Sequence, residues 1–327
     1  MSVDVLFAGS FFPEASRYLH EALPDATSAV ADPADLSADL PGAPLLVPLM
    51  SRIDGAVMDR VEGLKLIHQW GAGIEGVDIA AATVRGIAVA NIETGDSGNA
   101  ASVSEWCVMA ALALSRGLLG FKDEMATGRG WGYPVGRAMV GRKAGIVGFG
   151  GIGQLLAKRL LAFDMQVRVV TRSPEKHRDV LPGLTSIESD DALSNVLGEV
   201  DYLFLTLPLT SETRHLIDRA ALAAMRPRAY LINAGRGGLV DSNALLAALD
   251  AGVISGAALD VFEHEPLDPA SPLIMHPKTL VSPHIGGVTD RFFVHAAMQV
   301  IDALRRVKAG EPVPWALNAD ALAANAR

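Results

Sequence analysis

The sequence predicts an α/β protein with two domains, each built on a doubly wound parallel β-sheet. Three observations support this fold class. The chain has 327 residues, a length that suits about two domains. Short apolar, β-branched runs alternate with helical patterns, and this alternation is typical of βαβ units with parallel strands. The runs also fall into two series separated by a polar stretch, which predicts two sheets.

The first series of apolar runs predicts the sheet of the N-terminal domain. A stretch rich in Gly, Asn and Ser, NIETGDSGNAASVSEW, follows this series, and we place the end of the first domain segment (1–98) within it. Ser102 and Glu105 in the same stretch have the S-x-x-E spacing of a capping box, so a long helix is expected to start there. The expected strands of this series are Val3–Ala8, Pro44–Val47, Leu64–His68 and Ile87–Ala90.

The second series predicts a larger sheet within residues 99–286. Because its six runs already complete a sheet, the helical segment RFFVHAAMQVIDALRRVKAG is expected to return to the first domain as part of residues 287–327. The chain would then cross twice between the domains and leave a cleft between them. The expected strands are Ala144–Phe149, Val167–Val170, Tyr202–Leu207, Ala229–Asn233, Ala257–Asp260 and Leu280–Ser282.

The composition favours a globular protein that acts on small molecules. The chain has 28 Lys and Arg against 37 Asp and Glu, a formal net charge of −9, which disfavours nucleic acid and anionic membranes as partners. No apolar run reaches the roughly 18 residues of a membrane span, and the N-terminal MSVDVLFAGS is a strand pattern, not a signal peptide. The single cysteine, Cys107, excludes an internal disulfide and fits a reducing compartment. We therefore expect a cytoplasmic protein.

A glycine-rich loop in the second series predicts a dinucleotide site. The stretch AGIVGFGGIGQLLAKRLLAF contains a G-x-G-x-x-G pattern after an apolar run and before a helix, which is the context that this motif requires. Gly148 permits the tight turn, Gly150 lets the backbone approach a pyrophosphate, and Gly153 allows the helix to pack closely on the strand. With Gly151 and Ile152, the unpaired N–H groups at the helix start complete a Rossmann-type phosphate loop.

The residues after the next strand indicate which dinucleotide is bound. An acid that hydrogen-bonds the adenosine ribose is expected roughly 20 residues beyond the loop. This chain has Thr171, Arg172 and Ser173 there. A carboxylate would repel a 2′-phosphate, whereas a guanidinium and two hydroxyls donate hydrogen bonds to one. The sequence therefore favours NADP(H), with NAD(H) and a merely solvated Arg172 as the alternative.

Three later stretches each place polar residues just beyond a strand. YLINAGRGGLVD supplies Arg236, GAALDVFEHEPL supplies Asp260, Glu263 and Glu265, and TLVSPHIGG supplies His284. Because ligands bind beyond the carboxyl ends of parallel strands, these side chains are expected to converge beside the dinucleotide. A protonated His can give a carbonyl oxygen its proton, a carboxylate can orient that His and raise its pKa, and an Arg can bind a carboxylate. The set predicts reduction of a 2-oxo acid by hydride transfer. No metal-ligand spacing appears, and this chemistry needs no metal.

At these residues the chain resembles the D-isomer-specific 2-hydroxyacid dehydrogenase family. GFGGIG, NAGRGGLVD, DVFEHEP and SPHIGG occur in the family's order and at its spacings, and WGAGIEGVD and GWGYPVGRAMVGRKAGIVGFG match two further segments. The resemblance covers essentially the whole chain. It implies a Rossmann nucleotide-binding domain inserted into a smaller, flavodoxin-like substrate domain. It also implies a homodimer formed through the nucleotide domains.

The resemblance assigns roles to individual residues. Arg236 binds the substrate carboxylate, His284 is the acid/base, and Glu265 is its partner because the family's acid directly precedes a proline. Backbone amides at Ala72 and Gly73 hold the other side of the substrate carboxylate. The implied cofactor contacts beyond the glycine loop are Leu207 and Pro208 at the adenosine end, then Ala234, Gly235, Arg236, Asp260, His284 and Gly286.

Two departures from the family pattern matter. Asp164 stands where members commonly have Gly, which we expect to be a small stability cost because Asp tolerates a left-handed turn. Thr171 and Arg172 replace the acid of NAD-linked members and resemble the NADP-linked glyoxylate and hydroxypyruvate reductase branch. We therefore expect an NADPH-dependent reductase of a small 2-oxo acid. An NAD-linked dehydrogenase acting catabolically is one alternative. A dinucleotide-sensing binding protein with little turnover is another, which the intact Arg, Glu and His set disfavours.

Overall fold

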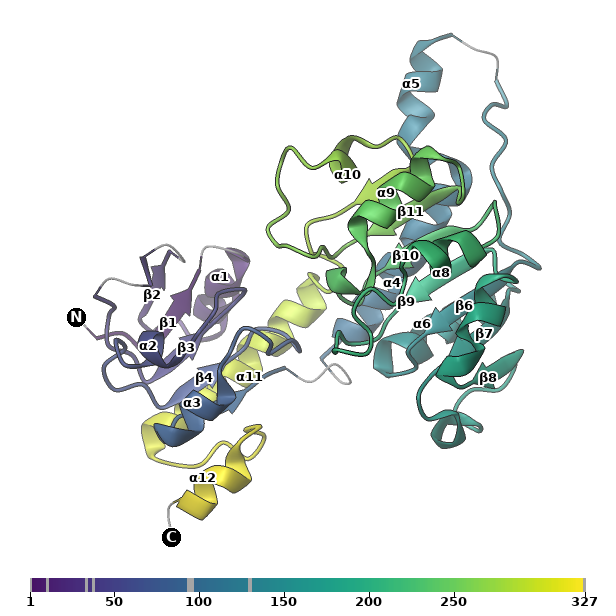
Figure 1. Cartoon of the computed structure of the whole chain (residues 1–327). Coiled ribbons are helices and arrows are strands. Elements are labelled where there is room, and N and C mark those ends of the chain that lie inside the picture. The colour runs from purple at the N-terminus through teal and green to yellow at the C-terminus, as the bar shows by residue number, and fades with distance from the viewer. Residues whose placement is uncertain are drawn as a thin grey trace. The chain divides into compact units, whose positions relative to one another are not determined.

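Two parallel-sheet units make up the chain, and the first is formed by both ends of the polypeptide (Figure 1). The computed structural model describes residues 2–9, 12–32, 35–36, 39–92, 97–128 and 131–325. One unit comprises Met1–Gly98 and Asp290–Arg327, and the other comprises Asn99–Thr289. The predicted class, an α/β protein with two parallel sheets, is confirmed.

The first unit has a five-stranded parallel sheet within the described residues, in the order β2-β1-β3-β4-β5. Its strands are β1 Val5–Ala8, β2 Ser28–Ala31, β3 Leu45–Val47, β4 Leu66–His68 and β5 Ala88–Ala90. This is the 2-1-3-4-5 order of flavodoxin-like sheets, the fold type that the resemblance implies for this domain. Strand β2 is not among the predicted strands, because its SAVA sequence has only three apolar residues, of which only Ala31 is buried.

The long C-terminal helix α11, Asp290–Ala309, belongs to this first unit. It packs against α1, Glu14–Ala22, and its Phe293 ring centroid lies 5.3 Å from that of Tyr18. The same ring lies 5.9 Å from Trp70, which follows β4. Aromatic contacts of this kind fix the helix on the first sheet. The remaining helices of the unit are α2 Gly55–Met58, α3 Ile79–Val84 and α12 Ala319–Asn325.

The second unit has a seven-stranded parallel sheet within the described residues, in the order β12-β11-β10-β9-β6-β7-β8. Its strands are β6 Lys143–Val147, β7 Gln166–Val170, β8 Ser186–Glu188, β9 Tyr202–Leu205, β10 Tyr230–Asn233, β11 Gly256–Leu259 and β12 Thr279–Val281. Counted from β6, this contains the 3-2-1-4-5-6 order of dinucleotide-binding sheets. Each of the six predicted runs forms a strand. The additional strand β8 lies at the edge and is half-exposed along its length, so it has no apolar run.

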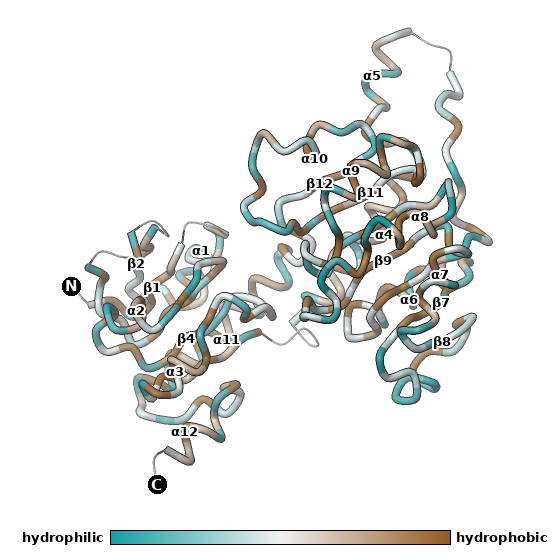
Figure 2. The backbone as a smooth tube through the Cα atoms, in the orientation of Figure 1, coloured by the Kyte–Doolittle hydropathy of each residue, from teal (hydrophilic) through white to brown (hydrophobic). Residues whose placement is uncertain are grey.

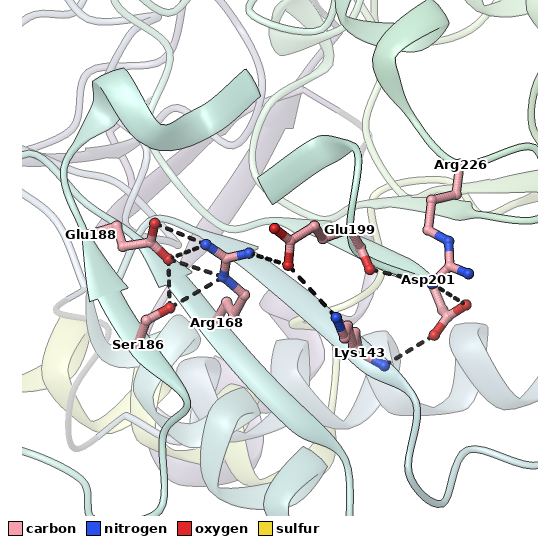
Figure 3. A network of polar contacts seen from close by, with 7 residues as sticks. All are labelled: Lys143, Arg168, Ser186, Glu188, Glu199, Asp201 and Arg226. Atoms are coloured by element: carbon pink, nitrogen blue, oxygen red, sulfur yellow. Dashed lines mark hydrogen bonds and ion pairs between the residues drawn. The ribbon is translucent and has the colours of Figure 1, made fainter. Parts of the chain in front are cut away.

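Charged side chains fasten the edge strand β8 to its sheet (Figure 3). Arg168 of β7 donates from Nη2 to both carboxylate oxygens of Glu188 in β8, at 2.7 and 2.9 Å. The same guanidinium donates from Nη1 to Glu199 at 2.8 Å, and Lys143 pairs with Glu199 at 3.6 Å. Lys143 is the first residue of β6, Arg168 is the middle residue of β7, and Glu188 is the last residue of β8. The edge strand is therefore held to its sheet by ion pairs.

Alternate residues of the central strand β9 pack on opposite faces of this sheet. The helices of the unit are α4 Asn99–Arg116, α5 Phe121–Ala126, α6 Gly151–Ala162, α7 Leu193–Leu197, α8 Arg219–Ala224, α9 Ser242–Asp250 and α10 Pro272–Met275. Tyr202 and Phe204 are buried with α4 and α6, whereas Leu203 and Leu205 are buried with α7, α8 and α9. Figure 2 shows β9 among the brown, hydrophobic segments. The two cores hold the sheet rigid beneath its carboxyl edge.

Helix α4 begins at Asn99, so the predicted capping box at Ser102 and Glu105 is wrong. Ser102 lies inside the helix, and its hydroxyl is 2.8 Å from Thr289 Oγ1. Glu105 accepts a hydrogen bond from Arg159 Nη2 at 2.9 Å. Both side chains bind distant segments, a tertiary use that their local spacing does not reveal.

The second unit ends at Thr289, beyond the predicted boundary at residue 286. A Cβ added to Gly287 would lie 2.4 Å from Asn99 Nδ2, so this backbone lies directly on the start of α4. With the hydrogen bond between Ser102 and Thr289, this contact keeps residues 287–289 in the second unit.

Asp164 has a φ of +56°, the left-handed conformation expected at a position where glycine is common.

Among the described residues, no single helix has both the length and the apolar composition of a membrane span. Helix α4 and Leu118–Ala126 together meet those two criteria as a bent pair.

Candidate active site

The glycine-rich loop joins β6 to α6 and leaves one side open. Gly148 has a φ of +96°, and a Cβ there would lie 2.8 Å from the Cβ of Leu207, so the turn requires glycine. At Gly153 a Cβ would lie 2.2 Å from the carbonyl oxygen of Gly148, which reflects close packing of helix on strand. A Cβ on Gly150 would meet nothing within 4 Å. The geometry at each glycine fits the role that the motif predicts.

The start of α6 can bind an anion. The helix begins at Gly151, Ile152 and Gly153, and its N-cap residue makes no side-chain cap. Its first-turn N–H groups and the positive end of its dipole are therefore available to a phosphate. Thr206 Oγ1 donates to the Gly148 carbonyl oxygen at 2.9 Å, which holds the segment after β9, with Leu207 and Pro208, beside the loop. The glycine-rich loop and the start of α6 together could hold the pyrophosphate of a dinucleotide.

The turn after β7 carries an exposed guanidinium. Thr171, Arg172 and Ser173 follow the strand directly, and the outer two are half-buried while Arg172 is exposed. Within the part of the chain that the structure describes, Arg172 makes no hydrogen bond or ion pair. A hydrogen bond from Thr210 does most to lower the pKa of Glu212, and the positive charge of Arg172 contributes to that lowering. The guanidinium is thus available to a phosphate, with one carboxylate in electrostatic reach.

His284 and Glu265 form a hydrogen-bonded pair beyond β12. His284 Nδ1 lies 2.7 Å from Glu265 Oε2, with side-chain exposures of 36% and 16%. Because a carboxylate only accepts, the imidazole Nδ1 carries the hydrogen and Nε2 remains for a substrate. The other oxygen of Glu265 accepts from the N–H of Phe262 at 2.8 Å, which fixes the carboxylate plane. The pair has the geometry of a histidine acid/base with its orienting acid.

The surroundings of His284 favour its protonated form. Burial acts to lower the pKa of His284, but the hydrogen bond and charge of Glu265 and the charge of Asp260 act to raise it. The charge of Arg236 acts in the lowering direction. The raising influences prevail, so the pKa of His284 lies above its ordinary value. The imidazolium therefore persists to higher pH than in an exposed histidine.

Asp260, at the end of β11, holds the turn that carries His284. Its buried carboxylate accepts from the Ser282 hydroxyl at 2.6 Å and from the N–H of Ile285 at 2.8 Å on one oxygen. The other oxygen accepts from the N–H of Gly286 at 2.7 Å, and a Cβ on Gly286 would lie 2.8 Å from it. The N–H of His284 donates to the Asp260 carbonyl oxygen at 2.8 Å. These bonds impose on His284 a φ of +56°. The carboxylate is thus bound to this turn, a role that the sequence did not indicate.

Arg236 lies at the carboxyl end of β10. Its Nη1 donates to the Gly235 carbonyl oxygen at 2.8 Å. Asn233 shapes the turn, since its Nδ2 donates to the Arg236 carbonyl oxygen at 2.9 Å and its Oδ1 accepts from the N–H of Gly235 at 3.1 Å. A Cβ on Gly235 would lie 2.8 Å from the Leu207 carbonyl oxygen, so the turn, with buried Ala234, lies against the segment after β9. Arg236, Glu265 and His284 thus follow three neighbouring strands of one sheet.

Glu263 is not the partner of His284. It lies 2.5 Å from Nε2 of His215, a residue for which the sequence offered no pattern. The choice of Glu265 over Glu263 as the acid beside His284 therefore agrees with the geometry.

Ala72 and Gly73 lie in the first unit, in the loop after β4. The Ala72 carbonyl oxygen accepts from Asn91 Nδ2 at 2.7 Å, and the N–H of Ile92 donates to the Gly71 carbonyl oxygen at 2.9 Å. The loop is therefore fixed to the segment that follows β5. Its position at the carboxyl ends of the strands is that of a ligand loop.

Known proteins resemble this chain over nearly its full length. The model of the D-isomer specific 2-hydroxyacid dehydrogenase NAD binding domain matches residues 108–286. A glyoxylate reductase of Thermofilum pendens is 38% identical over 288 residues, which cover 85% of this chain and 82% of that protein. The chain also matches mycobacterial D-3-phosphoglycerate dehydrogenases at 36% identity and spans about half of their length, 51%.

Solved structures show the same arrangement of elements. The TT0316 protein from Thermus thermophilus superposes with a TM-score of 0.81 at 33% identity, covering 96% of this chain and 99% of that one. A D-isomer specific 2-hydroxyacid dehydrogenase from Xanthobacter autotrophicus Py2, solved in complex with NADPH and MES, has a TM-score of 0.69 at 27% identity. That match covers 98% of this chain and 100% of the other.

Proposed function

Because this chain belongs to the D-isomer specific 2-hydroxyacid dehydrogenase family, we propose that it reduces a small 2-oxo acid to the D-2-hydroxy acid with NADPH as the preferred cofactor. The hydrogen-bonded pair of Glu265 after β11 and His284 after β12, in the same sheet as the strand before Arg236, is the observation that carries this proposal. Glyoxylate and hydroxypyruvate are the substrates of choice, and the relative from Thermofilum pendens is a glyoxylate reductase.

The proposed proton donor is His284. When bound, the reduced nicotinamide supplies a hydride to the carbonyl carbon of the substrate. The imidazolium of His284 gives its Nε2 proton to the carbonyl oxygen, which becomes the hydroxyl of the product. Glu265 holds the ring through Nδ1 and stabilises the charge that the ring carries before transfer. The resulting neutral imidazole regains a proton from solvent before the next turnover.

We propose that the side chain of Arg236 and backbone amides bind the substrate carboxylate together. The planar guanidinium of Arg236 can bind the substrate carboxylate with two hydrogen bonds and polarise the adjacent carbonyl group. Amides of Ala72 and Gly73 would hold the other side of the carboxylate. Local positive charge of this kind would let a protein with a net charge of −9 bind an anionic substrate.

The proposed NADPH preference rests on the turn after β7. Arg172 is exposed, and Thr171 and Ser173 add two hydroxyls beside it. Such a set donates to a 2′-phosphate and offers no carboxylate acceptor for the ribose hydroxyl of NADH. The charge of Glu212 in electrostatic reach of Arg172 favours the alternative, an NAD-linked enzyme, because it opposes a second anion there.

We also propose a homodimer formed through the second unit. Helix α5 extends away from the seven-stranded sheet (Figure 1), and the neighbouring segment exposes Trp131 by 98% and Val135 by 88%. Apolar side chains gathered on one projecting segment are typical of an interface. Light scattering should give twice the chain mass, and Val135→Glu should shift the protein toward the monomer. The other exposed apolar residues of this region are Leu118, Leu119, Phe121, Met125, Tyr133 and Val140.

A panel of 2-oxo acids, assayed by nicotinamide absorbance with NADPH and with NADH, tests the proposed function. We expect turnover of glyoxylate or hydroxypyruvate and a higher kcat/KM with NADPH. A higher kcat/KM with NADH would support the NAD-linked alternative. Cofactor binding without turnover of any oxo acid would support a dinucleotide-sensing protein.

A further inference from the structure

A second histidine–carboxylate pair lies beside the proposed catalytic residues. His215 Nε2 is 2.5 Å from Glu263 Oε1, and the two side chains are 39% and 22% exposed. His215 has a φ of +52°, a conformation that non-glycine residues adopt rarely and that the surrounding structure must impose. Backbone hydrogen bonds hold this conformation, because the N–H groups of His215 and Ile217 donate to the carbonyl oxygens of Gly238 and Leu239 at 2.8 and 2.9 Å.

The pair connects three loops at the carboxyl edge of the sheet. His215 belongs to the segment after β9, which also contains Leu207 and Pro208, and its N–H donates to the Gly238 carbonyl oxygen at 2.8 Å. The second oxygen of Glu263 accepts from the N–H of Ser242 at 3.2 Å, at the start of α9. One carboxylate therefore ties its own turn to the segment after β9 and to the end of the Arg236 loop.

The loops of Arg236 and Glu265 are also in direct backbone contact. A Cβ on Gly237 would lie 1.8 Å from the carbonyl carbon of Phe262, so no space separates the two loops. The N–H of Phe262 in turn donates to Glu265 Oε1 at 2.8 Å. Because Glu263 lies between Phe262 and Glu265, a shift of Glu263 must move the carboxylate that orients His284.

We propose that His215 and Glu263 are positioning residues that hold Glu265 in line with His284. The hydrogen bond between them fixes the turn of residues 262–265 to the segment after β9, so that Glu265 Oε2 lies 2.7 Å from Nδ1 of His284. This inference rests on the proposed function for its effect on turnover, but its effect on His284 itself can be measured without a substrate.

Proton NMR titration of the His284 ring in the full-length protein tests the proposal. The His284 resonance is identified by its loss in His284→Gln. His215→Leu should lower the pKa of His284, because a loosened Glu265 stabilises the imidazolium less. His215→Gln retains an N–H donor toward Glu263 and should keep the wild-type titration. Glu263→Gln, which keeps the side-chain volume, should lower the pKa as His215→Leu does.

His276→Leu is the matched control. His276 Nε2 lies 3.3 Å from Asp250, so this variant removes another histidine–carboxylate pair of the same unit that touches neither catalytic loop. An unchanged His284 titration in both His215→Leu and Glu263→Gln, or an equal shift in His276→Leu, would overturn the proposal. With an active oxo acid, His215→Leu should reduce kcat roughly 10- to 100-fold, the scale of a small misplacement of catalytic groups. Failure of the wild type to turn over any oxo acid would refute the proposed function and leave the titration result standing.

Discussion

Replacing Glu265 by Gln removes the charge beside His284 and keeps the side-chain shape. Nδ1 of His284 lies 2.7 Å from Glu265, whose side chain is only 16% exposed, so the hydrogen bond is charge-assisted and little screened. Hydrogen bonds to charged groups contribute about 1.5–3 kcal/mol. The 36% exposure of His284 argues for the lower end of that range. About 1.4 kcal/mol corresponds to a tenfold change in an equilibrium constant. At pH values above the pKa of His284, the protonated fraction of this residue in Glu265→Gln should therefore be roughly tenfold smaller than in the wild type.

The pH dependence of Glu265→Gln follows from the direction of the pKa shift. In the wild type the pKa of His284 is raised, so the proton donor survives to higher pH than an ordinary histidine would allow. Without the carboxylate that pKa falls, and the decline of reduction at high pH should begin at lower pH. At acidic pH, where both proteins carry the imidazolium, kcat should differ least.

The assay is kcat/KM for NADPH oxidation across pH with an active oxo acid. Glu105→Gln is the control, because Glu105 pairs with Arg159 in the same unit at 2.9 Å but lies on α4, outside the turns that carry the proposed catalytic residues. A wild-type pH profile in Glu265→Gln, or an equal shift of the profile in Glu105→Gln, would refute the assigned role of Glu265.

Three further variants test the other proposed roles. His284→Ala should reduce kcat by about 10²–10⁴-fold, the usual contribution of a general acid, while NADPH binding measured by fluorescence persists; a fully active variant would exclude His284 as the donor. Arg236→Lys keeps the charge but loses the planar pair of donors, so kcat/KM for every active oxo acid should fall strongly in steady-state assays; wild-type values would contradict its role. Arg172→Ala should lower kcat/KM with NADPH by about one to two decades, mostly through KM, and leave NADH kinetics nearly unchanged; an equal loss with both cofactors would show that Arg172 does not bind the 2′-phosphate.

Most strands could be predicted because buried parallel strands are continuous apolar runs, whereas the order of the strands in each sheet followed only from the resemblance to the family. Strands β2 and β8 were not predicted, because they are edge strands whose residues are mostly accessible. Strand β8 depends on the ion pair between Arg168 and Glu188, residues that are 20 positions apart. The start of α4 was misplaced because Ser102 hydrogen-bonds Thr289, 187 positions away, instead of capping its own helix.

Some residues of the candidate site could likewise be predicted from the sequence, and others could not. Arg236, Glu265 and His284 could be predicted because each sits in a short motif directly after a strand, and the sheet brings adjacent strand ends together. The pair of His215 and Glu263 could not, because its members are 48 positions apart and His215 lies in no motif. Asp260 was predicted as a site residue, but its bonds to the His284 turn depend on a backbone conformation that appears only in the folded chain.

The most direct test is the fate of a labelled hydride. NADPH carrying deuterium at the transferable position of the nicotinamide should be incubated with the purified protein and hydroxypyruvate, and the product analysed by mass spectrometry and chiral chromatography. We expect one deuterium at C2 of the D-2-hydroxy acid, with the hydroxyl proton drawn from solvent. A product without deuterium at C2, or the L isomer, would contradict the proposed hydride transfer.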